Sequence, residues 1–406
     1  MDNQNLINMA RKYGTPLFTY DYETILARIE ELKTQIGQYE NCEFLYAAKA
    51  NHNPHIVKIM VENGFGVDAV SINEAKVGLL VGCPLEKVMY TENNISDAEM
   101  DEAHELGILV NFNSIKRLHK FGQKYPGSKI CVRFNPNVGA ASHSTNITGG
   151  PNSKFGIAYQ YVEDVKKIAE QYDLKIVGIH QHIGSGWLTL EEPQLALDVI
   201  LDIARQIPGL EFVDFGGGFG VPYKPEQSRL DLQTLGAKFK EKMDAFNLEY
   251  YGNTEQKIKL RFEPGRYAIC EAGKLITEVT NTKTTPEGKT YVGTNTGMNH
   301  LIRPALYGSY HGITNLSNPE GPLKTYDIVG NICESADYFA KDRELPETTP
   351  GDLLSINNAG AYGTAMSSLY HLRSIPTEVL IYKDGTDKLI KPAQSFEEIV
   401  SVYNYK

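Results

Sequence analysis

Lys49 is the first residue of this chain whose setting could support chemistry. It ends the apolar run YAAKAN (46–51), between alanines that are too small to shield its amine. The simpler interpretation is a lysine at a strand end whose stem lies on apolar surface while its amine reaches water. The alternative is an amine placed to bond covalently to an aldehyde, with small neighbours that leave room for it. Position alone favours the simpler interpretation, so other motifs must decide.

Three further strand-like runs end in unusual residues, namely HQHIGSG (180–186), FGGGFG (215–220) and EPGR (263–266). Three consecutive glycines let backbone N–H groups converge on an anion without interference from Cβ atoms, although taken alone a tight turn is the more frequent explanation. Glu263 at a strand end needs a cationic partner, and a protonated pyridine nitrogen is one. A reactive lysine, a phosphate cradle and an acid for a ring nitrogen together predict pyridoxal 5'-phosphate as the cofactor.

A metal site is the competing interpretation of the HQH stretch. His180 and His182 would share one face of a strand and could be two zinc ligands, as in metal-dependent hydrolases. No other cluster of His, Asp and Glu at the strand ends completes a ligand set, and a metal leaves Lys49 and the glycines unexplained. We therefore predict no metal, with His180 packed and hydrogen-bonded in the wall of the fold.

These residues follow strands of a repeating pattern in which short β-rich runs alternate with amphipathic segments of helical spacing. The predicted strands are 43–49, 64–70, 87–92, 108–112, 129–135, 175–183, 210–216 and 258–265. Near-continuous apolar strands separated by helices indicate a parallel sheet. Eight such units predict an α/β fold, a (β/α)₈ TIM barrel, whose chemistry lies at the carboxyl ends of the strands. A doubly wound sheet is the alternative, but no GxGxxG follows the first strand.

After about residue 275 the helical spacing nearly vanishes and strands joined by turn residues follow. The predicted strands are 274–283, 289–295, 323–330, 352–360 and 376–390. We expect a pyridoxal-phosphate-binding barrel over 25–275 and a C-terminal β domain, barrel-like or sandwich-like, over 276–406. The early strand-like run TPLFTYD (15–21), within 1–24, is expected to pair with the C-terminal sheet.

The composition indicates which classes of partner the protein binds and which cellular compartment it occupies. The 406 residues carry a net charge of −10, which argues against a nucleic-acid partner. The five cysteines are scattered without a CxxC pair, as is typical of reduced thiols rather than a disulfide framework. No apolar run has membrane-spanning length and the N-terminal stretch has no signal-like core, so we predict a cytoplasmic protein with no membrane partner.

Seven motifs in order carry a resemblance over nearly the whole chain: YAAKAN, HIGSG, GGGFG, EPGRY, NHLIRPALYGSYH, NICESADYF and GAYGTAMSS. Together they resemble the fold-type III pyridoxal-phosphate decarboxylases, whose barrel is like that of alanine racemase, and among these the diaminopimelate decarboxylases. This resemblance implies decarboxylation of meso-2,6-diaminopimelate to L-lysine and CO₂, the final step of lysine biosynthesis. It implies that Lys49 bonds to the cofactor, His182 stacks on its ring, Glu263 pairs with the ring nitrogen and Asp68 supports Lys49. The residues that it implies for the phosphate are Ser185, Gly217, Gly218, Gly265, Arg266 and Tyr362.

The resemblance also implies the substrate contacts. Arg266, Arg303 and Tyr307 would grip the distal carboxylate, a task suited to guanidinium groups. Glu334 would take the distal amine, with Ser335 and Tyr362 as further contacts. Cys333 and Glu334 would reach the partner subunit's site, so a homodimer with shared sites is expected. Cys333 or Lys49 would return the proton to the substrate carbon.

The sequence departs from the family pattern at two places, and three alternative functions remain open. The family commonly has Asp where this chain has His300, and the loop 138–157 matches only at its SKFGI end. The alternatives are a related decarboxylase acting on ornithine, lysine or a D-amino acid, a racemase on the same barrel, and a non-catalytic homologue that binds the cofactor. Ornithine decarboxylases carry Asp after the cysteine of CES (333–335). Racemases place a catalytic tyrosine in a different motif. A non-catalytic homologue is disfavoured by the presence of Lys49, Glu263, Cys333 and Tyr362.

Overall fold

The computed structural model describes residues 2–252 and 254–403. The chain divides into two compact units, and each is described by itself. The barrel unit comprises Arg28–Val221 and Ser228–Tyr267, and the β unit comprises Met1–Ala27, Pro222–Gln227 and Ala268–Lys406.

Parallel strands form the centre of the barrel unit. They are β2 (Cys42–Ala47), β3 (Gly66–Ala69), β4 (Val88–Thr91), β5 (Leu109–Phe112), β6 (Lys129–Asn135), β8 (Lys175–His180), β9 (Phe212–Asp214) and β10 (Lys259–Phe262). The pairing of β5 with β6 closes the ring, and the short β7 (Ile157–Ala158) is attached to β6 outside it. The eight-stranded (β/α)₈ barrel predicted from the sequence is thus confirmed for the described residues.

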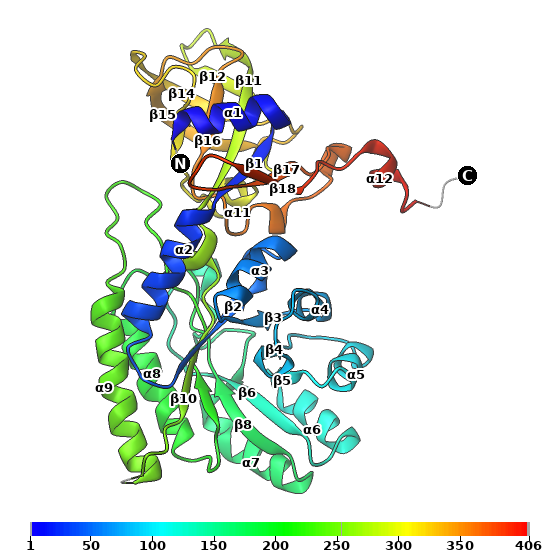
Figure 1. Ribbon diagram of the computed structural model, residues 1–406, viewed down its shortest axis with the longest axis vertical. Helices are drawn as coiled ribbons and strands as arrows, with labels where there is room; N and C mark the ends of the chain where they lie inside the picture. The colour runs from blue at the N-terminus through cyan, green and yellow to red at the C-terminus, as the bar shows by residue number, and fades with distance from the viewer. Residues whose placement is uncertain (1, 253, 404–406) are drawn as a thin grey trace. The chain divides into compact units, whose positions relative to one another are not determined.

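Helices surround these strands in the barrel unit (Figure 1). They are α3 (Pro54–Glu62), α4 (Ile72–Leu80), α5 (Asp97–Glu105), α6 (Ile115–Lys124), α7 (Val162–Gln171), α8 (Glu191–Ala204) and α9 (Leu232–Tyr251). Three of the helices begin in the same way, because Ser71, Ser96 and Ser114 each accept the N–H of the residue three positions later. Such caps satisfy backbone donors that would otherwise be unpaired and fix where a helix starts after its strand.

A packed layer of side chains from five strands, β2, β4, β6, β8 and β9, lies in the core of the barrel unit. Its members are Leu45, Met89, Cys131, Val177 and Phe212. Gly178 leaves room for this layer, because a Cβ there would lie 2.0 Å from Cζ of Phe212. The interior is therefore a packed core, which leaves the strand ends as the place for chemistry.

The β unit is a mixed sheet. Its strands are β1 (Leu17–Asp21), β11 (Gly273–Thr284), β12 (Thr290–Thr294), β13 (Ile313–Asn315), β14 (Leu323–Val329), β15 (Tyr338–Pro346), β16 (Leu353–Ile356), β17 (Thr377–Ile381) and β18 (Asp387–Lys391). The order is β15-β14-β12-β11-β1-β17-β18, with β16 pairing to β11 and β13. β1 pairs antiparallel with β11 and parallel with β17, which confirms the predicted pairing of the early strand.

Short helices complete the description. α1 (Asn3–Tyr13), α11 (Arg303–Tyr307) and α12 (Phe396–Val400) belong to the β unit, and α2 (Tyr22–Glu31) and α10 (Arg266–Ile269) cross the unit boundaries. None of the described helices is both long and apolar enough to cross a bilayer.

Several predicted strand limits are wrong in one direction, since the strands end sooner than expected. β2 ends at Ala47 and gives way to a 3₁₀ turn over Ala48–Ala50, and β8 ends at His180. β9 is only Phe212–Asp214, because Oδ1 of Asp214 accepts the N–H of Gly216 at 2.8 Å and turns the chain. Lys49, His182 and Glu263 consequently lie in the turns just beyond the strands.

Candidate active site

Lys49 lies on a turn beyond β2 and contacts a buried carboxylate. Its Nζ is 2.7 Å from Oδ2 of Asp68 in β3, and the side chains are 32% and 0% exposed, respectively. The other oxygen of Asp68, Oδ1, has no hydrogen-bond partner among the described residues. The structure thus brings together the two residues that were predicted to act together, with the amine near solvent and its carboxylate fixed in the wall.

The alanines beside Lys49 allow the turn after β2 and the turn after β10 to pack closely together. A Cβ at Gly265 would lie 3.0 Å from Cβ of Ala50 and 3.1 Å from Cβ of Ala47. Larger side chains at these positions would push the turn after β10 away from the turn that carries Lys49. The alanines therefore set the spacing between the lysine turn and the EPGR turn.

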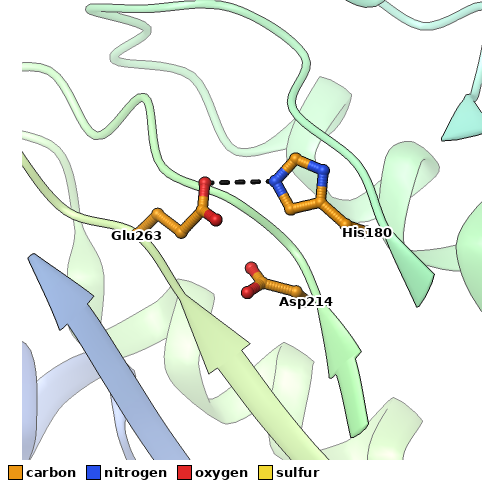
Figure 2. A group of neighbouring side chains, drawn as sticks. All are labelled: His180, Asp214 and Glu263. Atoms are coloured by element: carbon orange, nitrogen blue, oxygen red, sulfur yellow. Dashed lines mark hydrogen bonds and ion pairs between the residues drawn. The ribbon is translucent and has the colours of Figure 1, made fainter. Parts of the chain in front are cut away.

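A buried cluster of His180, Asp214 and Glu263 lies at the ends of β8, β9 and β10 (Figure 2). Nε2 of His180 is 3.1 Å from Oε2 of Glu263, and one ligand-type atom from each residue lies within 4.8 Å of the others. The argument that no other cluster of His, Asp and Glu at the strand ends completes a ligand set is therefore wrong, since Asp214 and Glu263 both lie beside His180. The paired metal ligands His180 and His182 are not observed as such, because His182 faces the glycine loop instead.

Burial sets the protonation of this cluster. It raises the pKa of Asp214 and of Glu263 to about 8 each, and it lowers the pKa of His180 to about 3. The imidazole of His180 is therefore neutral, and the two carboxyl groups retain protons near neutral pH. A cation beside Glu263 would stabilise its carboxylate form and lower this pKa, so the residue could then pair with a protonated ring nitrogen.

The glycine loop and the HIGSG turn form a cradle beside this cluster. The N–H of Gly217 donates to Nδ1 of His182 at 3.1 Å, and a Cβ at Gly217 would lie 2.0 Å from the carbonyl oxygen of Glu263. Gly218 has φ +104°, in the region that favours glycine, and a Cβ there would lie 2.1 Å from the carbonyl oxygen of Gly184.

A serine and an arginine add polar groups to the same unit. Nε and Nη2 of Arg266 donate to Oγ of Ser185 at 3.3 and 3.1 Å. Both were predicted as phosphate contacts, and the structure brings them together. A guanidinium, a hydroxyl and glycine N–H groups are the donors that a phosphate monoester requires.

These residues fit pyridoxal phosphate. Oε1 of Glu263 is a buried acceptor without a hydrogen-bond partner among the described residues, which is the group a protonated ring nitrogen would satisfy. Lys49 offers the amine, and the Ser185–Arg266 pair with the glycine loop offers the anion site.

The predicted substrate residues of the β unit include a buried arginine. Arg303 is 2% exposed, its Nη2 donates to Oγ of Ser309 at 3.2 Å, and its Nε has no hydrogen-bond partner within the part of the chain that the structure describes. Its Cζ lies 5.9 Å from the ring centre of Tyr307 and 5.3 Å from that of Tyr223. Tyr362 lies in the same unit with φ +57°.

Cys333, Glu334 and Ser335 are exposed in the turn between β14 and β15. The carboxylate of Asp337 fixes this turn by accepting the N–H of Ile332 at 2.7 Å, and the hydroxyl of Tyr370 donates to Glu334.

His300, which departs from the family pattern, has a structural explanation. It is buried, its Nδ1 lies 2.9 Å from Oγ1 of Thr296, and its Nε2 lies 3.1 Å from the carbonyl oxygen of Ser374. Burial lowers its pKa to about 4. Both ring nitrogens are engaged within the β unit.

Sequence reasoning missed four residues that influence the predicted ones. These are Arg133, whose positive charge acts on the pKa of Glu263, and Asp214, Tyr223 and Tyr370, which lie beside Glu263, Arg303 and Glu334, respectively. Asp214 carried a usable signal, because an Asp two residues before a glycine often caps a turn with its side chain. The other three carried none, since their partners are distant in sequence.

Comparison with known proteins shows the family. A sequence profile described as "Pyridoxal-dependent decarboxylase, pyridoxal binding domain" matches residues 22–270. The diaminopimelate decarboxylase of Methanothermobacter thermautotrophicus is 38% identical over 98% of this chain and 94% of its own length. The chain belongs to the diaminopimelate decarboxylase family. Members of this family are pyridoxal-phosphate-dependent decarboxylases, so the predicted enzyme class and cofactor are confirmed.

Solved structures agree with this assignment. A crystal structure of diaminopimelate decarboxylase has a TM-score of 0.91 at 31% identity, covering 99% of this chain and 96% of its own. The enzyme of the family from Helicobacter pylori, in complex with L-lysine, has a TM-score of 0.89 at 29% identity, covering 98% and 99%.

Proposed function

We propose that this member of the family removes CO₂ from meso-2,6-diaminopimelate and releases L-lysine, as the final step of lysine biosynthesis. The relatives named above support this substrate. The observation that carries it is Arg303, a buried guanidinium that no described acidic residue pairs within its unit. A buried cation without an anionic partner is costly, and a second carboxylate on the substrate would provide that partner. Ornithine and lysine have no such group.

Each predicted cofactor residue has a task in this proposal. When bound, the cofactor supplies an electron sink for the pair left behind when CO₂ departs. Lys49 would hold the cofactor through its amine, with Asp68 keeping that amine in position. Glu263 would pair with the ring nitrogen, and His182 would support the ring. The residues that would hold the phosphate are Ser185, Gly217, Gly218, Gly265, Arg266 and Tyr362.

The substrate residues complete the reaction. Arg303, Tyr307 and Arg266 bind the distal carboxylate, and Glu334 binds the distal amine, with Ser335 and Tyr362 beside them. Cys333 or Lys49 returns a proton to the carbon that has lost CO₂. In this assignment residues 25–275 bind the cofactor and 276–406 supply substrate recognition.

The exposure of Cys333, Glu334 and Ser335 supports a homodimer with shared sites. If these polar and thiol groups take part in catalysis, they would be excluded from water only when a second subunit covers them. We propose a cytoplasmic location because none of the five cysteines, all of which the structure describes, forms a disulfide.

The direct test is mass-spectrometric detection of lysine from meso-diaminopimelate with added pyridoxal phosphate. Ornithine, lysine and D-amino acids serve as competing substrates, and Lys49→Ala is the matched inactive control. We expect lysine release by the wild type alone, with little turnover of the smaller substrates. Faster turnover of ornithine or lysine would reject this substrate assignment.

Subunit mixing tests the shared site. Lys49→Ala and Glu334→Ala homodimers should each be nearly inactive, and a mixed dimer should regain activity because one of its two sites keeps both residues. Absence of recovery after verified subunit exchange would place Glu334 in its own chain's site.

A further inference from the structure

Tyr223 packs on the buried guanidinium of the β unit. It belongs to the segment Pro222–Gln227, which follows the glycine loop in sequence but is part of the β unit. The ring centre of Tyr223 is 5.3 Å from Cζ of Arg303, at the distance of a cation–π contact. This residue has no role in the resemblance or in the proposed mechanism.

Three contacts fix the orientation of the Tyr223 ring. Its hydroxyl is 3.0 Å from Sγ of Cys270, and that sulfur in turn donates to the carbonyl oxygen of Asn358 at 3.3 Å. The ring of His311 packs against it edge to face, with centres 5.4 Å apart at 81°. The amide of Asn358 donates to the carbonyl oxygen of Pro222 at 3.1 Å, which anchors the backbone just before Tyr223.

An aromatic face suits this position better than a carboxylate. A carboxylate would occupy the N–H groups of Arg303 and leave fewer for a ligand, whereas a ring face attracts the cation without accepting its in-plane hydrogen bonds. Nε of Arg303 has no hydrogen-bond partner among the described residues, so the ring leaves this donor unoccupied.

We propose that Tyr223 is a positioning residue that holds the guanidinium of Arg303 for the distal carboxylate and thereby selects substrates with a second carboxylate. This inference rests on the proposed function. Tyr223 acts through Arg303, so its loss should affect ligands with a distal carboxylate and spare ligands without one.

The test compares two ligands of the holoenzyme that differ in that carboxylate. The KM for meso-diaminopimelate and the Ki of 1,5-diaminopentane, which carries both amines but no carboxylate, are measured for wild type, Tyr223→Leu and Tyr223→Met. We expect the KM to rise about tenfold, as for loss of a desolvated cation–π contact, while the Ki of 1,5-diaminopentane stays within about twofold. Tyr223→Phe keeps the ring face and should recover most of the loss in KM.

Tyr310→Leu is the matched control. The ring of Tyr310 lies 3.9 Å from Cζ of Arg343 in the same unit, and that arginine donates to the carbonyl oxygen of His311 rather than facing a ligand. This substitution removes a similar contact and should leave both constants unchanged. Thermal melting and cofactor absorbance verify that each variant is folded and loaded.

A double substitution decides whether Tyr223 acts through Arg303. In an Arg303→Ala background, Tyr223→Leu should cause no further rise in the KM. The inference is overturned if Tyr223→Leu and Tyr223→Met leave the KM unchanged, if the Ki of 1,5-diaminopentane rises in parallel, or if the effects simply add. Failure of the wild type to form lysine from diaminopimelate would instead reject the proposed function, so the two failures are distinguishable.

Discussion

Replacing Asp214 with Asn should flatten the pH dependence of stability of the cofactor-free protein. Asp214 is fully buried, and its Oδ1 accepts the N–H of Gly216 at 2.8 Å. An asparagine has the same shape and keeps an oxygen acceptor for this bond. Asp214→Asn therefore removes the titration while it preserves the turn before the glycine loop.

The sign and size of the effect follow from the raised pKa. Burial raises the pKa of Asp214 to about 8, whereas the unfolded chain has already ionised this group above pH 5. The folded state thus holds a proton that the unfolded state lacks, and stability falls as pH rises through 8. Between pH 7 and 8.5 the protonated fraction falls from about nine-tenths to about a quarter, which costs about 1 kcal/mol for this group. Glu263, also raised to about 8, adds a loss in the same direction.

The assay is urea denaturation of cofactor-free wild type and Asp214→Asn at pH 7.0, 7.5, 8.0 and 8.5. The wild type should lose about 1 kcal/mol more than the variant over this range, or about 3 °C in melting temperature for a unit of this size. The histidines contribute little here, because burial lowers the pKa of His180 and the unfolded imidazole is already mostly neutral above pH 7. Parallel losses in the two proteins would refute the assignment of a titrating proton to Asp214.

Three further outcomes are expected. Borohydride reduction of the loaded wild type should fix the cofactor on Lys49, as mapped by peptide mass spectrometry; a label on another lysine would contradict the site. Glu263→Gln should keep its cofactor, because the phosphate contacts remain, but kcat should fall about 100-fold in steady-state assays; normal kcat at full occupancy would remove Glu263 from the reaction. Tyr370→Phe removes the hydrogen bond to Glu334, worth about 1 kcal/mol, and should raise the KM for diaminopimelate about fivefold; an unchanged KM would show that Tyr370 does not orient Glu334.

The barrel strands were predictable because buried parallel strands are nearly continuous apolar runs, and each predicted run overlaps an observed strand. The ends of the strands were not predictable, because hydrogen bonds of single side chains determine them. The hydrogen bond from the N–H of Gly216 to Oδ1 of Asp214, for example, ends β9 early. β15 was missed because its sequence, YFAKDRELP, is half polar, as suits a strand at the end of the sheet order. β13 has only three residues and was missed for lack of any periodicity.

The candidate site shows the same limit. Lys49, His182 and Glu263 stood out because reactive residue types follow strands, and the structure places Lys49 against Asp68 as predicted. Tyr223 did not stand out, because its importance lies in a contact with Arg303, 80 positions later in the chain.

The place of β1 in its sheet has a consequence for synthesis of the protein. Leu17, Phe18, Thr19 and Tyr20 are fully buried between β11 and β17, neither of which leaves the ribosome until most of the chain has been made. At 5 to 20 residues per second, this apolar strand waits roughly 20 to 70 s for both neighbours. The barrel strands can pair during that time, whereas β1 has both edges open to other chains. We expect chaperones that act on nascent chains to bind this strand. A polar substitution in the strand should lower the requirement for these chaperones, and it should also weaken the finished sheet.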